Sequence, residues 1–151
     1  MGAGTIANPA RTPIPTTVVR ITGACIMLAC IAMLSVGASL KPNQNGYGTH
    51  TSIGLPPCGW AAATGTPCAS CGMTTAVTHV SHGDFASGFV TQPAGALVAI
   101  AASVALWAGT HALATGAHTG AMFGFLLRPT GIAIIVGIIL AAWAYKWVTW
   151  N

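Results

Sequence analysis

The chain has 151 residues, of which 54% are hydrophobic and only 4% are charged, and its formal net charge is +4. About a quarter of the residues in soluble domains are charged, so this composition excludes an ordinary water-soluble protein and indicates a chain whose solvent is lipid. The five basic residues are scattered, which argues against nucleic-acid binding, and a single carboxylate, Asp84, cannot supply paired acid–base catalysis.

The chain begins with a polar tail, residues 1–17, that contains Pro9, Pro13 and Pro15. Prolines at this spacing disfavour a helix, and we expect the tail to lie against the rest of the protein or a neighbouring subunit. Residues 18–40 form the first apolar run, which has about the 20 residues that a transmembrane helix needs. Although its start resembles a secretory signal, we interpret the run as an uncleaved membrane anchor.

Residues 41–93 are predicted to form a loop followed by a short cysteine-rich helical hairpin. The loop is dominated by Gly, Asn and Pro, which favour turns. Apolar side chains then recur with the period of an amphipathic helix, at Met73, Ala76, Val77 and Val80. Gly83 interrupts this pattern, and Asp84 is predicted to cap a second short helix that ends near Gln92.

A second transmembrane helix is predicted over residues 94–113. Small residues occupy every fourth position along part of it, at Gly95, Ala99 and Ser103. Such a pattern lets another helix approach closely. Residues 114–129 are predicted to be a Gly-rich connection, in which the apolar residues 122–127 are expected at the membrane interface.

Residues 130–150 are predicted to be the third transmembrane helix. A second face of small residues occurs on it, at Ala133, Gly137 and Ala141. Aromatic and basic side chains crowd its end, namely Trp143, Tyr145, Lys146, Trp147 and Trp150. These side chains are predicted to form a girdle where the helix leaves the membrane.

The lysine and arginine residues predict how the three spans are oriented in a bacterial inner (cytoplasmic) membrane. If the N-terminus is cytoplasmic, the inner side has Arg11, Arg20 and Arg128, and the outer side has Lys41 and Lys146. This distribution agrees with the positive-inside rule. The cysteine-rich hairpin is then expected on the outer face, in an oxidising compartment where disulfides persist.

The hairpin carries three cysteines whose chemistry the sequence leaves open. Cys68 and Cys71 form a Cys-x-x-Cys pair at the predicted start of a helix, whose dipole favours a thiolate. With Cys58 and a histidine they could bind zinc in a tetrahedral site, for which His79 is the better fourth ligand and His82 the weaker one. Alternatively, two of the cysteines could form a disulfide or a redox pair, or all three could be inert thiols.

His111 lies near the end of the second predicted span. An ionisable side chain inside a membrane is a functional candidate, and the small neighbours of His111 leave room for a flat ring such as haem or chlorophyll. The alternative is a hydrogen bond from this histidine to a neighbouring helix near the membrane edge.

The segment from Thr64 to Ala76 reads TGTPCASCGMTTA. With Cys58 upstream and the pairs Gly83-Asp84 and Gln92-Pro93 downstream, it resembles the bacterial membrane family called domain of unknown function 2752. That family has Cys, then Thr-Gly-x-Pro-Cys-Pro-x-Cys-Gly-x-Thr-Arg-Ala, then Gly-Asp and Asn-Pro. This chain departs from the pattern at Ala69, where Pro is usual, and at Thr75, where Arg is usual. The resemblance implies similar flanking helices and supplies no activity.

The sequence therefore predicts a small all-α integral membrane protein with about three transmembrane helices and the cysteine-rich hairpin between the first two. We expect an accessory or structural subunit of a larger membrane assembly, without catalysis of its own and without a small-molecule substrate. Its expected partners are other membrane subunits and lipid. The alternative is a metal-binding or thiol-redox protein that uses Cys58, Cys68 and Cys71, and a third interpretation is a pigment- or haem-binding subunit through His111.

Overall fold

The computed structural model describes residues 15–117 and 128–150, and every regular element within them is a helix. Three of these helices are long and apolar enough to cross a membrane: α1 (Thr16–Ser39), α5 (Pro93–Thr115) and α7 (Pro129–Val148). The predicted all-α fold with three spans is confirmed, and the chain is a multi-pass membrane protein. The contacts expected of residues 1–14 and the interfacial position expected of residues 122–127 lie outside the described residues.

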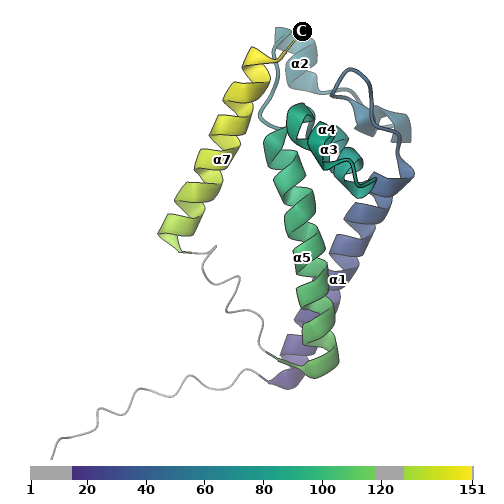
Figure 1. Ribbon diagram of the computed structural model, residues 1–151, viewed down its shortest axis with the longest axis vertical. Helices are drawn as coiled ribbons and strands as arrows, with labels where there is room; N and C mark the ends of the chain where they lie inside the picture. The colour runs from purple at the N-terminus through teal and green to yellow at the C-terminus, as the bar shows by residue number, and fades with distance from the viewer. Residues whose placement is uncertain (1–14, 118–127, 151) are drawn as a thin grey trace, which may run out of the picture.

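The cysteine-rich region lies at one end of the spans (Figure 1). It contains η1 (Thr49–Ile53), α2 (Gly59–Thr64), α3 (Met73–Ser81) and α4 (Phe85–Thr91), which follow one another between α1 and α5. Helices α1 and α7 run toward this end and α5 runs away from it. Consequently Lys41, which follows α1, and Lys146, near the end of α7, lie toward the cysteine-rich end, whereas Arg20 and Arg128 lie near the starts of α1 and α7, which point away from it.

Helices α1 and α5 cross in close contact through two glycines. A β-carbon on Gly23 would lie 2.8 Å from the carbonyl oxygen of Gly109, and one on Gly109 would lie 2.9 Å from that of Gly23. Both distances are shorter than real side chains allow, so this crossing requires glycine on both helices. The pattern of small residues at every fourth position did not predict this crossing, because α1 contributes a single glycine here and not a row of small residues.

The two predicted small-residue faces behave differently. On α5, Gly95 and Ala99 are buried against α3, where Ala99 joins a core with Val77 and Val80. On α7, a β-carbon at Gly137 would meet nothing within 4 Å. Ala133 and Ala141 are exposed as well, so the small face of α7 is open in the described part of the chain.

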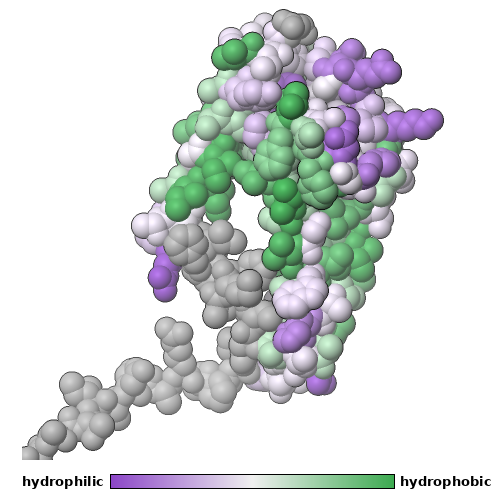
Figure 2. Space-filling model, viewed as in Figure 1, coloured by the Kyte–Doolittle hydropathy of each residue, from purple (hydrophilic) through white to green (hydrophobic). Residues whose placement is uncertain are grey.

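In the view of Figure 2, hydrophobic side chains dominate the middle of the spans, and hydrophilic ones gather near the cysteine-rich end and also occur at the opposite ends of the helices. Many large apolar side chains on the spans are exposed, among them Ile21, Leu28, Val104, Ile134 and Leu140. In a bilayer these side chains contact lipid or another membrane protein rather than water, so their exposure costs no hydrophobic free energy.

The end of α7 turns its polar atoms toward the cysteine-rich region. The indole N–H of Trp143 donates to the carbonyl oxygen of Pro67 at 3.1 Å, and that of Trp150 donates to Gly65 at 3.1 Å. Lys146, predicted to lie in a girdle at the membrane surface, is instead buried, with 5% of its surface exposed. Trp147 remains exposed. Most of the predicted girdle thus attaches α7 to the cysteine-rich region, and Trp143 and Trp150 attach it to the loop between Cys58 and Cys68.

Candidate metal centre

Tight turns bring the cysteines together in the structure. Cys58 precedes α2, and Gly65 ends that helix in the left-handed conformation, which returns the chain toward Cys58. The backbone N–H of Cys71 then donates to the carbonyl oxygen of Cys68 at 3.1 Å, which closes a turn around the Cys-x-x-Cys pair. Gly72 follows and caps the start of α3. Its φ of +87° is in the left-handed region, which favours glycine.

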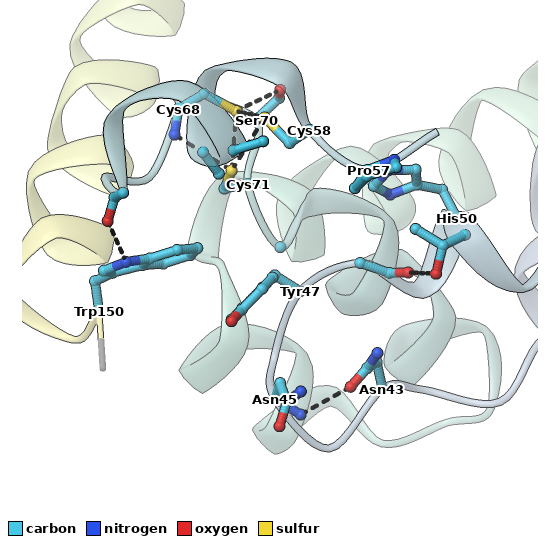
Figure 3. Close-up of a pocket in the computed structure, with 16 residues that line it drawn as sticks. Asn43, Asn45, Tyr47, His50, Pro57, Cys58, Cys68, Ser70, Cys71 and Trp150 are labelled. Atoms are coloured by element: carbon cyan, nitrogen blue, oxygen red, sulfur yellow. Dashed lines mark hydrogen bonds between the residues drawn. The ribbon is translucent and has the colours of Figure 1, made fainter. Parts of the chain in front are cut away.

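The three sulfur atoms converge on one point (Figure 3). The Sγ atoms of Cys68 and Cys71 are 3.0 Å apart, and the Sγ atom of Cys58 lies 3.4 Å from Cys68 and 3.7 Å from Cys71. Cys71 is buried, and the other two are half-buried. Within the described residues, these three cysteines are a group whose ligand atoms could hold a metal ion together.

Hydrogen bonds around the sulfurs distinguish Cys68 from Cys71. Burial alone would raise the pKa of the Cys68 thiol, but hydrogen bonds with Ser70, Cys71 and Cys58 outweigh it and lower that pKa to about 7. Burial and the contact with Cys68 raise the pKa of the Cys71 thiol to about 12. The backbone N–H of Cys68 points at the Sγ atom of Cys71, 3.2 Å away. Such an N–H stabilises negative charge on a sulfur atom.

The sulfur cluster lies on the wall of an open pocket of about 700 Å³. Side chains from the loop after α1 form the opposite wall, including Asn43, Asn45 and Tyr47. The ring of Tyr47 packs against Trp150, with 4.4 Å between ring centroids. The cluster is therefore accessible to a small ligand, although Cys71 itself is buried.

His79, the predicted fourth ligand, is not part of the sulfur cluster. Its Nδ1 atom lies 3.2 Å from a carboxylate oxygen of Asp84. The reason is its position along α3: Cys71 precedes the helix, whereas His79 lies six residues after its first residue, about 9 Å further along the axis. Asp84 also caps α4, because its other oxygen accepts the backbone N–H of Ser87 at 3.1 Å. These two contacts with Ser87 and His79 lower the pKa of the Asp84 carboxyl.

The remaining predicted histidines also lie apart from the cysteines. His82 is exposed, and its Nδ1 atom lies 2.8 Å from the carbonyl oxygen of Thr78. His111 is exposed on α5 and stacks on Trp107, with 5.7 Å between ring centroids. The histidine that lines the pocket is His50, which stands beside Pro57 and away from the sulfurs (Figure 3).

Lys146 is the residue at this site that the sequence did not predict. Its Nζ atom donates to the carbonyl oxygens of Gly46 at 3.3 Å and Thr91 at 3.2 Å. It also lies 3.4 Å from where a β-carbon on Gly72 would be, next to Cys71 in the chain. The only available signal was a lysine in the last turn of an apolar helix, which is equally typical of a surface girdle.

Two buried polar side chains, Gln92 and Thr75, join the cysteine turn and α3 to neighbouring elements. Gln92 is fully buried: its amide nitrogen donates to the carbonyl oxygen of Ala69 at 3.3 Å, and its amide oxygen accepts the N–H of Gly95 at 3.0 Å. Thr75 is also fully buried and shares a hydrogen bond of 2.9 Å with Thr49. Thr75 occupies the position where arginine is usual in the family that the sequence resembles. In this chain the position therefore forms a neutral hydrogen bond between α3 and η1.

The comparison with protein families confirms the resemblance found in the sequence. The family described as Protein of unknown function (DUF2752) matches residues 58–107. This segment covers the three cysteines, α3, α4 and the first part of α5. No curated protein and no solved structure matches the chain.

Proposed function

We propose that this chain is a membrane protein that binds a thiophilic metal ion, zinc above all, through Cys58, Cys68 and Cys71. The observation that carries this proposal is the convergence of three sulfur atoms with mutual distances of 3.0, 3.4 and 3.7 Å. Thiolates bind zinc at about 2.3 Å in a tetrahedron, which places neighbouring sulfurs about 3.8 Å apart. The three observed distances are shorter than this spacing, and the distance between Cys58 and Cys71 is nearest to it.

A disulfide accounts for only part of this arrangement. A disulfide joins two sulfurs and would leave the third cysteine of the cluster without a partner. A metal ion uses all three sulfurs at once, and the N–H that points at Cys71 would stabilise a metal-bound thiolate there. The contact among all three cysteines therefore favours the metal.

The proposed site leaves the fourth coordination position to water or an external donor. Within residues 15–117 and 128–150, the ligand group contains the three cysteines and no histidine or carboxylate. Structural zinc sites have four protein ligands, whereas sites with three protein ligands exchange the fourth. The open pocket beside the sulfurs gives a small donor access to that position.

Metal analysis of the purified full chain tests this function. We expect about one zinc ion per chain after zinc loading and removal of excess metal, and loss of that ion in Cys58→Ser, Cys68→Ser and Cys71→Ser. Cys25→Ser is the matched control, because Cys25 is an exposed cysteine on α1 outside the cluster. Equal metal content in the control and the cluster variants would refute the proposal.

Dithiol chemistry is the second candidate function. It is favoured by the 3.0 Å contact between Cys68 and Cys71 and by the greater exposure of Cys68. The Cys68 thiolate would attack a substrate disulfide, form a mixed disulfide with one substrate sulfur and release the other as a thiolate. Cys71 would give its proton to that thiolate and attack Cys68, which releases the second substrate thiolate and leaves a Cys68–Cys71 disulfide. Mass analysis of metal-free protein after alkylation separates the candidates, since free thiols on both cysteines under oxidising conditions contradict the redox function.

We also propose, as an independent point, that the chain is a subunit of a larger membrane assembly without catalysis of its own. The observation that favours this is the small-residue face of α7, where Gly137 has open space around it. Small residues on a transmembrane helix allow a close approach of another helix. Gentle extraction followed by size analysis tests the assembly: a chain that runs alone as a monomer contradicts it.

The proposed orientation rests on the count of basic residues on each side of the spans. Arg20 and Arg128 stand near the starts of α1 and α7, and Lys41 and Lys146 near their ends, so these four residues balance. Arg11, which precedes α1 in the sequence, makes the count three against two, and the positive-inside rule then favours cysteines on the outer face of a bacterial inner membrane. A thiol reagent that does not cross membranes tests this orientation. It should label Cys68 in intact cells treated with a reductant and a chelator, and labelling only after lysis would reverse the assignment.

A further inference from the structure

We propose that Lys146 is the counter-charge of the metal–thiolate centre, so that the end of α7 sets the affinity of the cysteines for metal. This inference rests on the proposed metal site. It assigns a positioning role to a residue of the third span, which lies outside the segment that matches the family.

The first step is the burial of the lysine. Only 5% of Lys146 is exposed, and its Nζ atom contacts the carbonyl oxygens of Gly46 and Thr91 and lies over the ring of Trp150, 6.0 Å from its centroid. The carbonyl of Thr91 is at the end of α4, where the helix dipole is negative, and this partly compensates the ammonium charge. None of these partners has a full negative charge, and a buried charge without a full counter-charge is unfavourable, so a negative group nearby would stabilise the ammonium.

The second step is the identity of that negative group. Asp84 is the only acidic side chain of the chain, and its carboxylate already contacts His79 and Ser87. In the described part of the chain, the pair His79–Asp84 is the ion pair that forms, and Lys146 is not in it. Among the described side chains, the cysteine thiolates are the remaining groups that can balance Lys146. Its Nζ atom lies 3.4 Å from where a β-carbon on Gly72, the residue after Cys71, would be.

The third step is the charge of the centre. Three thiolates and a divalent ion have a net charge of −1, and one lysine brings the total to zero. Three neutral thiols would leave the lysine unbalanced. The single buried lysine thus matches a cluster that carries one negative charge, which is the charge of the zinc-loaded site.

The fourth step connects the charge to the position of α7. The same end of the helix donates to the carbonyl of Pro67, next to Cys68, and to that of Gly65. If metal binding increases the negative charge that Lys146 faces, it also strengthens the attachment of α7 to the cysteine loops. By thermodynamic linkage, the attached α7 then strengthens metal binding by the same factor by which bound metal strengthens the attachment.

The experiment measures zinc and cobalt affinity of the full chain in detergent by competition with a chromophoric chelator. Lys146→Gln keeps a hydrogen-bond donor but removes the charge, and Lys146→Met removes both. We expect both variants to bind about 10- to 100-fold more weakly, the usual cost of losing an outer-shell partner. Lys41→Gln is the control, because it removes an exposed charge at the same end of the spans.

The cobalt spectrum separates a charge effect from a structural one. A nearby cation stabilises the sulfur electrons, so loss of the Lys146 charge should shift the thiolate-to-cobalt band to longer wavelength in both variants. Wild-type affinity and band position in Lys146→Gln, with a loss only in Lys146→Met, would overturn the proposal and assign Lys146 to hydrogen bonding. Failure of the wild-type chain to bind either metal would instead refute the proposed function.

Discussion

The indole N–H of Trp143 donates to the carbonyl oxygen of Pro67 across a separation of 76 residues. This bond joins the third span to the residue that precedes Cys68, and Pro67 is itself buried. The cysteine turn is therefore held from two sides: by the family-matched segment through Gln92, and by α7 through Trp143.

Trp143→Phe should weaken both the fold and the proposed metal site. The substitution keeps an aromatic ring but leaves the buried Pro67 carbonyl without its donor, which costs about 1–3 kcal/mol. Unfolding in detergent and zinc affinity of the same protein measure the two effects. Trp147→Phe is the control, because 49% of Trp147 is exposed. Equal effects of the two substitutions would show that the Trp143 bond does not hold the turn.

Gly72→Ala should disrupt the junction between the cysteine turn and α3. The new β-carbon would lie 2.8 Å from the carbonyl oxygen of Gly46, an acceptor for Lys146. Gly54→Ala is a matched control, since Gly54 has a φ of +81° but open space around it. Both variants pay for the left-handed backbone, and we expect an extra cost of roughly 1–3 kcal/mol at Gly72 from crowding. Equal losses of unfolding free energy would exclude the crowding.

Gly109→Ala should destabilise the packing of α1 on α5. Its β-carbon would lie 2.9 Å from the carbonyl oxygen of Gly23, and the two helices must separate to admit it. Overpacking of this kind costs roughly 1–3 kcal/mol. Gly137→Ala on α7 adds the same group in open space and should leave stability in detergent unchanged or higher. A loss at Gly137 as large as the loss at Gly109 would contradict the observed crossing.

Acid should remove the contribution of Asp84 to the fold. The folded-state pKa of this carboxyl is lowered by its contacts with Ser87 and His79, so ionisation of Asp84 stabilises the folded chain above its ordinary pKa of about 4. That stabilisation is lost as the pH falls through the lowered value. Asp84→Asn keeps a capping side chain without the charge, and its stability should fall less between pH 5 and pH 2. Parallel curves for the two proteins would contradict the assignment.

The spans and the short helices α3 and α4 were predictable because their signals are local. About 20 apolar residues mark a membrane helix, and the pattern from Met73 to Val80 marks an amphipathic one. The structure moves the edges of the spans by a few residues, to Thr16–Ser39, Pro93–Thr115 and Pro129–Val148. Helix α2 went unpredicted because its six residues carry no periodic pattern.

The composition of the site was only partly predictable. The Cys-x-x-Cys spacing identified Cys68 and Cys71 as a pair, and the family pattern pointed to Cys58. The contact of Lys146 with Gly46 spans 100 residues, and no local signal reports such a contact. His79 was chosen from its spacing to Cys71, but the length of α3 carries it away from the sulfurs and toward Asp84.

X-ray absorption at the zinc edge of the zinc-loaded full chain tests the central claim most directly. If Cys58, Cys68 and Cys71 hold the metal, the spectrum should contain about three sulfur scatterers at about 2.3 Å and one lighter atom. Serine at Cys58 should reduce the sulfur count by one or abolish loading. A first shell made only of nitrogen and oxygen, or a wild-type chain that retains no zinc, would contradict a metal centre at these cysteines.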